Sequence, residues 1–254
     1  MQTLAVPFHV GDFVEGFHAP AGATLFRPEL PALAPSQRMA ALFGDLAGEV
    51  ARAGTPLVYA GDCMAPLGVL AGLERRGLSP FVVWLDAHGD FNTWETTPSG
   101  YIGGMPVAMM AGRGEQTIVR AIGLRTVEPG RILIADARDV DPAEGVALDG
   151  SGIRIVGVEE IARALPADVP IYVHLDVDVV TPSEMPALRF PAAGGPSLSS
   201  VEKALRAIGG TGRAVCATVA CTWNPLDPSA GAAAAATDRL VAALTGQRRR
   251  AASG

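Results

Sequence analysis

The chain has 254 residues and a net charge of −6, and 49% of its residues are hydrophobic and 18% charged. This composition excludes a disordered chain, and the acidic balance argues against nucleic acid as the main partner, because phosphate-binding surfaces need a concentrated basic face. No apolar run is long enough to span a bilayer, the three cysteines are too few for a disulfide framework, and the first residues lack a secretory pattern. We therefore expect a soluble cytoplasmic protein without a membrane partner.

Short apolar runs alternate with helical patterns along the chain, in the order typical of a parallel sheet. The predicted strands are 4–10, 57–60, 81–85, 117–122, 131–135, 153–158, 171–175 and 214–221. The predicted helices are 36–52, 66–76, 105–111, 199–208 and 238–244. The expected fold class is α/β, with one domain over 1–254, a mostly parallel sheet of about eight strands covered by helices on both faces, and a flexible tail at 246–254.

Acidic motifs follow two of the predicted strands. The first is Asp-Ala-His-Gly-Asp at 86–90, and the second is Asp176-Val177-Asp178. Since strand residues two apart point the same way, Asp86 and His88 are expected on one side, as are His174, Asp176 and Asp178. Carboxylates gathered at the end of a buried sheet repel one another unless cations bind there, and oxygen-rich sites with an imidazole favour Mn²⁺. Taken singly, each motif is also compatible with ordinary strand-end caps or turns.

Three motifs in this order resemble the ureohydrolase superfamily, which comprises arginases, agmatinases and formiminoglutamases. Gly61-Asp62-Cys63 is similar to the family's Gly-Asp-His, and 86–90 matches its Asp-Ala-His-x-Asp. His174-Leu175-Asp176-Val177-Asp178 stands where the family has Ser-x-Asp-x-Asp. The resemblance implies a three-layer arginase-like fold, two divalent metal ions with Mn²⁺ as first candidate, a guanidino substrate, and a homo-oligomer, trimer or hexamer.

The resemblance also implies roles for individual residues of the metal centre. One ion would be held by Cys63, Asp86, Asp90 and Asp176, and the other by Asp86, His88, Asp176 and Asp178, so that Asp86 and Asp176 bridge. Two cations lower the pKa of a shared water, and the resulting hydroxide attacks the central carbon of the guanidinium or amidine. Asp90 and His88 are the expected catalytic residues, with Asp90 passing a proton to the leaving amine.

Residues beyond the metal ligands resemble an arginase substrate site. Asn92 and Ser99 stand where arginases hold a substrate α-carboxylate, and Asp141 and Glu144 where they face the α-amino group. This favours an α-amino acid over agmatine. Asp-Pro turns and Asn or Ser caps remain the ordinary alternative for these positions.

Several positions depart from the family pattern. Cys63 replaces a histidine ligand, and a thiolate prefers softer ions, although a protonated thiol would instead leave the first metal position weak. His174 replaces a serine and is expected to orient a carboxylate rather than to bind the metal. Gly103 replaces a histidine thought to relay protons, which leaves His9 and His18 as candidates for that role or as structural residues.

Thr222 stands where the family's Glu pairs with the substrate guanidinium, so a charged contact becomes at best a neutral hydrogen bond. A substrate with a less basic guanidine loses less, which makes Nω-hydroxy-L-arginine the favoured hypothesis. Two alternatives stay open. One is a non-catalytic protein of this fold with a decayed metal site, and the other is an agmatinase-like or formiminoglutamase-like specificity.

Overall fold

The computed structural model describes residues 2–246, and an eight-stranded parallel sheet forms its centre. The strand order is β4-β1-β5-β10-β9-β6-β7-β8, and β2 and β3 form a separate antiparallel pair. The strands are β1 (Thr3–Val6), β2 (Phe8–His9), β3 (Asp12–Phe13), β4 (Thr24–Leu25), β5 (Leu57–Ala60), β6 (Phe81–His88), β7 (Ile132–Asp139), β8 (Arg154–Val156), β9 (Ile171–Asp176) and β10 (Ala214–Ala220).

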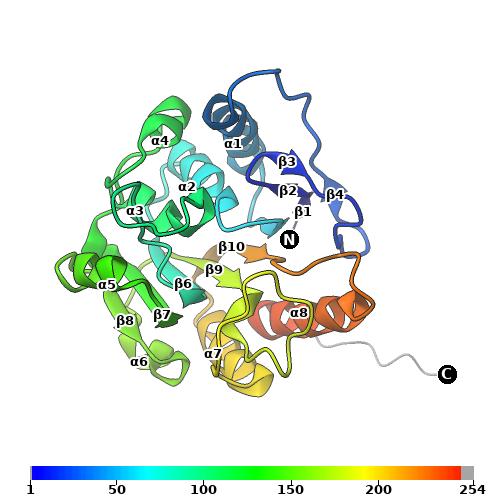
Figure 1. Ribbon diagram of the computed structural model, residues 1–254. Helices are drawn as coiled ribbons and strands as arrows, with labels where there is room; N and C mark the ends of the chain where they lie inside the picture. The colour runs from blue at the N-terminus through cyan, green and yellow to red at the C-terminus, as the bar shows by residue number, and fades with distance from the viewer. Residues whose placement is uncertain (1, 247–254) are drawn as a thin grey trace.

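Helices cover both faces of this sheet, which gives three layers (Figure 1). Along β6, Val82 and Trp84 belong to the hydrophobic core under α1–α5, whereas Val83 and Leu85 belong to the core under α6–α8. The helices are α1 (Pro35–Arg52), α2 (Ala65–Arg75), α3 (Pro106–Met110), α4 (Thr117–Ile122), α5 (Pro142–Asp149), α6 (Ile161–Ala164), α7 (Leu198–Gly210) and α8 (Ala230–Thr245). Short 3₁₀ turns are η1 (Ile102–Gly104), η2 (Pro129–Arg131), η3 (Val158–Glu160) and η4 (Val177–Val179). The predicted α/β architecture is confirmed.

Some element predictions were wrong. The β-branched segment 117–122 is helix α4, because Ile118, Val119 and Ile122 form one apolar stripe that is buried beside α1. The eighth strand is instead the short β4, which pairs with β1. The predicted strand 4–10 is divided at Pro7, whose nitrogen has no hydrogen to donate.

Other differences lie at helix boundaries. Helix α8 begins at Ala230, well before the predicted start at 238, because an alanine-rich run has high helix propensity. Helix α5 was not predicted at all. The predicted tail at 246–254 lies outside the described residues except for Gly246, which ends α8 in a left-handed conformation. Within residues 2–246, no helix combines the length and the hydropathy needed to cross a bilayer.

The sheet order explains how distant parts of the sequence meet. Strands β6, β9, β10 and β5 are neighbours near the centre of the sheet, and all run in the same direction. Their carboxyl ends therefore lie at one edge, where open parallel sheets bind ligands. The segments that begin after these ends carry Cys63, Asp90 and Thr222, while Asp86 lies two residues before the end of β6 and Asp176 is the last residue of β9.

Candidate functional site

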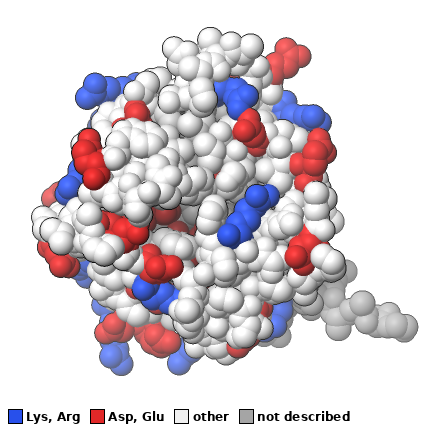
Figure 2. Space-filling model, viewed as in Figure 1, with Lys and Arg blue, Asp and Glu red and all other residues white. Residues whose placement is uncertain are grey.

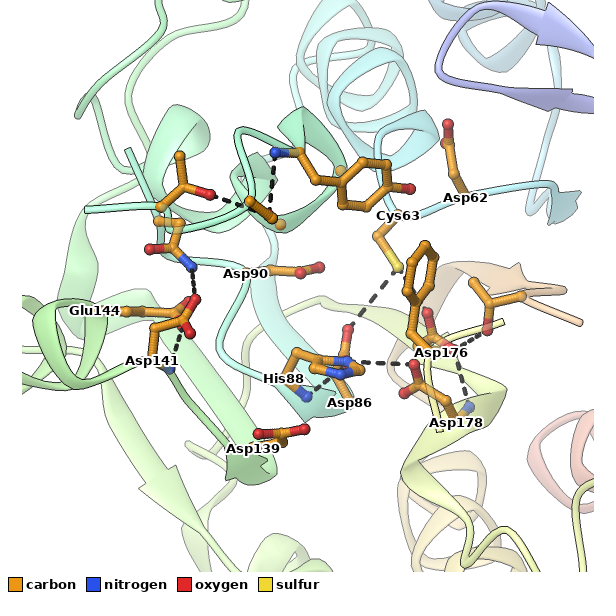
Figure 3. Close-up of a pocket in the computed structure, with 18 residues that line it drawn as sticks. Asp62, Cys63, Asp86, His88, Asp90, Asp139, Asp141, Glu144, Asp176 and Asp178 are labelled. Carbon is orange, nitrogen blue, oxygen red and sulfur yellow. Dashed lines mark hydrogen bonds and ion pairs between the residues drawn. The ribbon is translucent and has the colours of Figure 1, made fainter. Parts of the chain in front are cut away.

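A cavity of about 280 Å³ opens at the carboxyl edge of the sheet. Figure 2 shows this face hollowed near its centre, with Asp and Glu atoms in the hollow. Figure 3 shows the acidic side chains converging there from the ends of β6 and β9 and from the segments that follow other strands. Of the residues predicted for the site, the cavity is lined by Cys63, Asp86, His88, Asp90, Asn92, Ser99, Asp141, Glu144, Asp176, Asp178 and Thr222.

One group of possible metal ligands consists of Asp86, His88 and Asp178. His88 Nδ1 lies 3.2 Å from Asp86 Oδ1 and 3.3 Å from Asp178 Oδ2. Backbone N–H groups fix the carboxylates, since Ala87 N donates to Asp178 Oδ1 at 3.3 Å and His88 N donates to Asp86 Oδ1 at 2.8 Å. Asp86 and Asp178 are each 1% exposed, so water screens little of their charge.

A second group surrounds the buried thiol of Cys63. Its Sγ lies 2.8 Å from Asp176 Oδ2 and 3.9 Å from Asp86 Oδ2. Asp90 follows β6 in a left-handed conformation with φ +49°, and the backbone turns sharply there. Within the described residues, Asp90 Oδ2 is buried without a hydrogen-bond partner. An acceptor left free in this way fits a cation or a substrate proton at the centre of the cluster.

The electrostatics of the cluster follow from burial and like charge. Burial raises the pKa of Asp90 and Asp176 well above the ordinary range, and neighbouring carboxylates add to the effect. Burial, followed by the charge of Asp86, also raises the pKa of Asp178 to about 6. Burial alone would lower the pKa of His88, but hydrogen bonds to Asp178 and Asp86 raise it to about 12. Without bound cations, the buried carboxyl groups of this cluster therefore tend to stay protonated. Bound positive charge would stabilise their ionised forms.

The donor set fits a pair of divalent cations. One triad of ligand atoms comes from Asp86, His88 and Asp178 and another from Cys63, Asp86 and His174, and within each triad the atoms lie within 4.8 Å of one another. Asp86 belongs to both triads, as a bridging carboxylate requires. The two triads differ in chemistry, because one has only oxygen and imidazole donors and the other adds sulfur.

Among the described residues, His174 makes no hydrogen bond to a carboxylate, contrary to the expectation that it orients one. The side chain is fully buried below the cavity floor, and among the described residues neither ring nitrogen has a hydrogen-bond partner. Its ring lies 3.8 Å from that of Trp84, at an interplanar angle of 35°. The carboxylate Asp86 is bonded instead by the indole of Trp84, whose Nε1 donates to Oδ2 at 3.1 Å. Burial lowers the pKa of His174 to about 3, so its imidazole is neutral at pH 7.

The residues predicted to bind the amino acid end of a substrate form one wall of the cavity. Asn92 Nδ2 donates to Asp141 Oδ2 at 2.9 Å, which holds these two side chains together. Glu144 has both oxygens engaged, since Oε1 accepts from Phe91 N at 2.7 Å and Oε2 accepts from Asp141 N at 3.2 Å. Glu144 therefore ties the start of α5 to the segment after β6. Ser99 is exposed at the rim.

Thr222 lies at the floor of the cavity, after the end of β10. Its Oγ1 donates to Asp176 Oδ1 at 2.5 Å, and the side chain is 3% exposed. The backbone N–H of Asp178 donates to the same oxygen at 2.9 Å. Thr222 thus presents a neutral hydroxyl whose hydrogen is already directed to a carboxylate.

Sequence reasoning missed Tyr101, which occupies the space left by Gly103. A Cβ on Gly103 would lie 2.3 Å from Tyr101 Cζ, so the ring takes the place of any side chain there. Tyr101 Oη lies 3.1 Å from His9 Nε2, and His9 Nδ1 lies 3.2 Å from the carbonyl oxygen of Gly61. Because a carbonyl only accepts, Nδ1 carries the hydrogen in the neutral ring and Nε2 accepts from the tyrosine hydroxyl.

The structure separates the two histidines that the sequence left as candidates. His9 reaches Tyr101 because the chain reverses after β2, where Val10 and Gly11 have φ of +49° and +82°. His18 instead lies 3.1 Å from Asp238 Oδ1, away from the cavity. Gly103 and Tyr101 are close in the sequence, but no sequence pattern indicated that the tyrosine ring would cover the glycine.

Three kinds of comparison relate the chain to known proteins. A family model described as "Arginase family" matches residues 28–246. Arginase from Bacillus subtilis (strain 168) is 35% identical over 153 residues, which are 55% of this chain and 52% of that protein. The N(omega)-hydroxy-L-arginine amidinohydrolase of Streptomyces lavendulae is 33% identical over 129 residues, 49% of this chain and 45% of that protein. The chain thus spans about half the length of these curated relatives.

The fold comparison extends over nearly the whole chain. A crystal structure of arginase from Bacillus subtilis superposes with a TM-score of 0.82 at 27% identity, covering 98% of this chain and 99% of that one. The three-layer arrangement and the order of its strands are therefore those of a known α/β fold.

Proposed function

Because the chain belongs to the arginase family, we propose that it is a binuclear metal-dependent hydrolase. It would cleave a linear C–N bond of a guanidino amino acid and release urea or a urea analogue. The observation that carries this proposal is the pair of ligand triads that share Asp86 at the floor of the cavity. Mn²⁺ is proposed for the position made by Asp86, His88 and Asp178, since carboxylate oxygens with one imidazole suit that ion.

Cations bound at these triads would lower the pKa of a water molecule and polarise the guanidino group. Asp90 is proposed to move the proton. Its Oδ2 has no hydrogen-bond partner among the described residues, and burial raises its pKa, so it can hold a proton between the attacking water and the leaving nitrogen. The raised pKa follows first from burial and then from the negative charge of Asp86.

The amino acid end of the substrate is proposed to bind at the wall that carries Asn92, Ser99 and Asp141. Asp141 has a negative charge for an α-amino group, and Asn92 and Ser99 offer polar hydrogens to an α-carboxylate. Glu144 contributes by holding the Asp141 backbone, since its own oxygens already accept from N–H groups. This arrangement supports an α-amino acid over agmatine, which lacks the carboxylate.

The guanidino end would face Thr222, and this supports Nω-hydroxy-L-arginine as the preferred substrate. A neutral hydroxyl cannot form the charge-assisted pair that a cationic guanidinium needs, whereas hydroxylation makes the guanidine less basic. The name of the Streptomyces lavendulae relative gives the same compound as that protein's substrate.

The test is a side-by-side assay of arginine, Nω-hydroxy-L-arginine and agmatine, with bound metal counted on the same sample. Two metals per chain and turnover selective for the hydroxylated compound are expected. Fewer than two metals and no turnover of any compound would instead support a non-catalytic protein of this fold. Asp176→Ala should abolish turnover by removing a bridge, and Asp45→Ala, on the exposed side of α1, serves as its control. Size determination in solution tests the expected trimer or hexamer.

A further inference from the structure

We propose that Cys63, His174 and Asp86 bind a borderline or soft divalent cation of the zinc class, so that the two metal positions of the centre prefer different ions. This inference rests on the proposed function only in taking the centre to hold metal. It differs from the oxygen-rich pair expected from the family motifs, because it makes His174 a ligand and gives the first position sulfur and nitrogen donors.

The first observation is the imidazole of His174. It is fully buried, and in the described part of the chain both ring nitrogens lack a hydrogen-bond partner. Buried polar atoms are almost always paired, because an unpaired one has lost its water without replacement. Trp84, its cross-strand neighbour, packs against the ring and supplies no acceptor, since its Nε1 donates to Asp86. A cation is the partner that would satisfy a neutral ring nitrogen.

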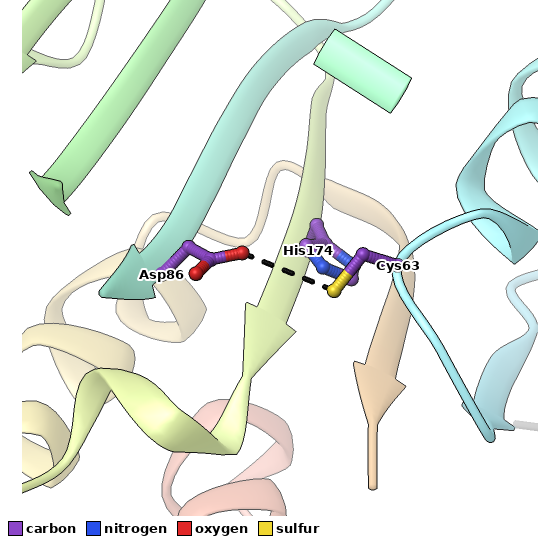
Figure 4. Close-up of side chains that lie close together, drawn as sticks. All are labelled: Cys63, Asp86 and His174. Carbon is purple, nitrogen blue, oxygen red and sulfur yellow. Dashed lines mark hydrogen bonds between the residues drawn. The ribbon is translucent and has the colours of Figure 1, made fainter. Parts of the chain in front are cut away.

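The second observation is the meeting of three different donors. One atom each from Cys63, Asp86 and His174 lies within 4.8 Å of the others, as three ligands around one ion require. Figure 4 shows the sulfur and the imidazole together beside β9, with the carboxylate reaching toward them from β6. Asp86 and His174 belong to β6 and β9, and Cys63 follows the end of β5, so all three donors are positioned by the central sheet.

The donor types select the class of ion. A thiolate and an imidazole with a carboxylate oxygen are a ligand set for zinc, which usually takes four ligands in a tetrahedron. Asp176 can complete the set, since its Oδ2 already lies 2.8 Å from the sulfur. On binding, the S–H bond of Cys63 breaks and a sulfur–metal bond forms. The proton passes to water in the cavity, so that Asp176 Oδ2 stays free to bind the ion.

Cobalt substitution tests the proposal on the full-length protein. Co²⁺ added to the metal-free wild type should give an intense near-ultraviolet thiolate-to-cobalt charge-transfer band and the strong visible bands of a tetrahedral ion. Cys63→Ser should lose the charge-transfer band while circular dichroism stays unchanged. The matched control is Cys216→Ser, which changes a buried cysteine of β10 that is outside the triad, and the band should persist there.

His174→Ala tests the imidazole separately. Zinc affinity, measured by competition with a chromophoric chelator, should fall at least about tenfold, as loss of a metal-site residue commonly causes. X-ray absorption of the zinc-loaded wild type needs no variant, and it should show one sulfur at about 2.3 Å.

The proposal is overturned if cobalt binds without the charge-transfer band, if that band survives in Cys63→Ser, or if His174→Ala leaves zinc affinity unchanged. The readouts do not depend on turnover. A charge-transfer band in a protein that hydrolyses no guanidino compound would reject the proposed function and keep this site. Turnover of a guanidino compound without sulfur ligation would support the proposed function and reject this site.

Discussion

The hydroxyl of Tyr101 lies 3.1 Å from His9 Nε2, and its ring covers the space above Gly103. Burial raises the pKa of Tyr101 far above its ordinary value, so the hydroxyl keeps its proton at any pH at which the protein functions. Figure 3 shows Asp90 among the acidic side chains of the cavity, which Tyr101 and Gly103 also line. Tyr101 lines the cavity, and its hydroxyl and the His9 imidazole form a hydrogen-bonded pair of groups that can carry a proton.

Tyr101→Phe should lower kcat by about tenfold or more and leave KM nearly unchanged, if the hydroxyl helps to deliver a proton to the leaving nitrogen. General acid catalysis contributes roughly 10²–10⁴-fold, and a histidine behind the tyrosine can restore the proton. Steady-state kinetics with the preferred substrate measures the effect. Tyr59→Phe is the control, since its hydroxyl bonds Asp238 outside the cavity. Equal kcat in both variants would assign Tyr101 a packing role only.

Thr222→Glu should shift preference toward arginine. The new carboxylate offers a cationic guanidinium the charge-assisted contact that Thr222 lacks, and a gain of about 1.4 kcal/mol corresponds to tenfold. The ratio of kcat/KM for arginine to that for Nω-hydroxy-L-arginine is expected to rise by roughly tenfold. Thr222→Gln keeps the size without the charge and should leave the ratio low. An equal rise of the ratio in both variants would mean that side-chain size, and not charge, causes the change in preference.

Metal removal should change how stability depends on pH. The pKa of Asp178 is about 6 in the folded protein instead of 3.8, so protonation of Asp178 favours the folded state. The contribution of Asp178 to stability is complete below about pH 4 and is lost as pH rises through 6. The Tm of the metal-free protein should therefore fall as pH rises over this interval. Added Mn²⁺ should raise Tm more at pH 7 than at pH 5. Thermal unfolding with and without metal measures both trends.

Asp178→Asn should flatten the metal-free trend between pH 4 and 6, because the amide does not titrate. Asp45→Asn, at an exposed position of α1, should leave the trend as it is. A metal-free protein whose Tm rises steadily over this interval would show that other groups outweigh the buried cluster.

Glu144→Gln should destabilise the fold by about 1–3 kcal/mol, because the side chain is 3% exposed and an amide nitrogen cannot accept from a backbone N–H. The loss should also loosen Asp141 and raise KM more than it lowers kcat. Urea denaturation and steady-state kinetics measure the two effects. Glu160→Gln changes an exposed carboxylate that bonds Gly157 N in the same way, at 3.1 Å, and should cost little. Matching losses in both variants would mean that burial of Glu144 adds nothing.

The residues at the floor of the cavity could be predicted from the sequence because two properties of parallel sheets determine where they lie. Buried parallel strands appear as apolar runs, and their carboxyl ends share one edge. Asp86 and Asp176 follow two such runs, so both are expected at that edge, and the pairing of β6 with β9 brings them together. By contrast, the six residues 117–122 carry β-branched side chains that suit a strand, and only packing beside α1 makes them a helix.

The contacts that distinguish this site were decided by tertiary structure. The sequence determined that Glu144 follows Asp141 by three residues, but a capping role and a substrate role use the same spacing, and only the position of Phe91 N separates them. Likewise, the sequence shows that Gly103 has no side chain. Only the structure shows that the ring of Tyr101 occupies the space beside it, where His9, from a distant part of the chain, bonds the tyrosine hydroxyl. Local residue order thus determined which donors end each strand, and long-range packing decided which of them remain free to bind, because burial removes water and leaves only the neighbours as partners.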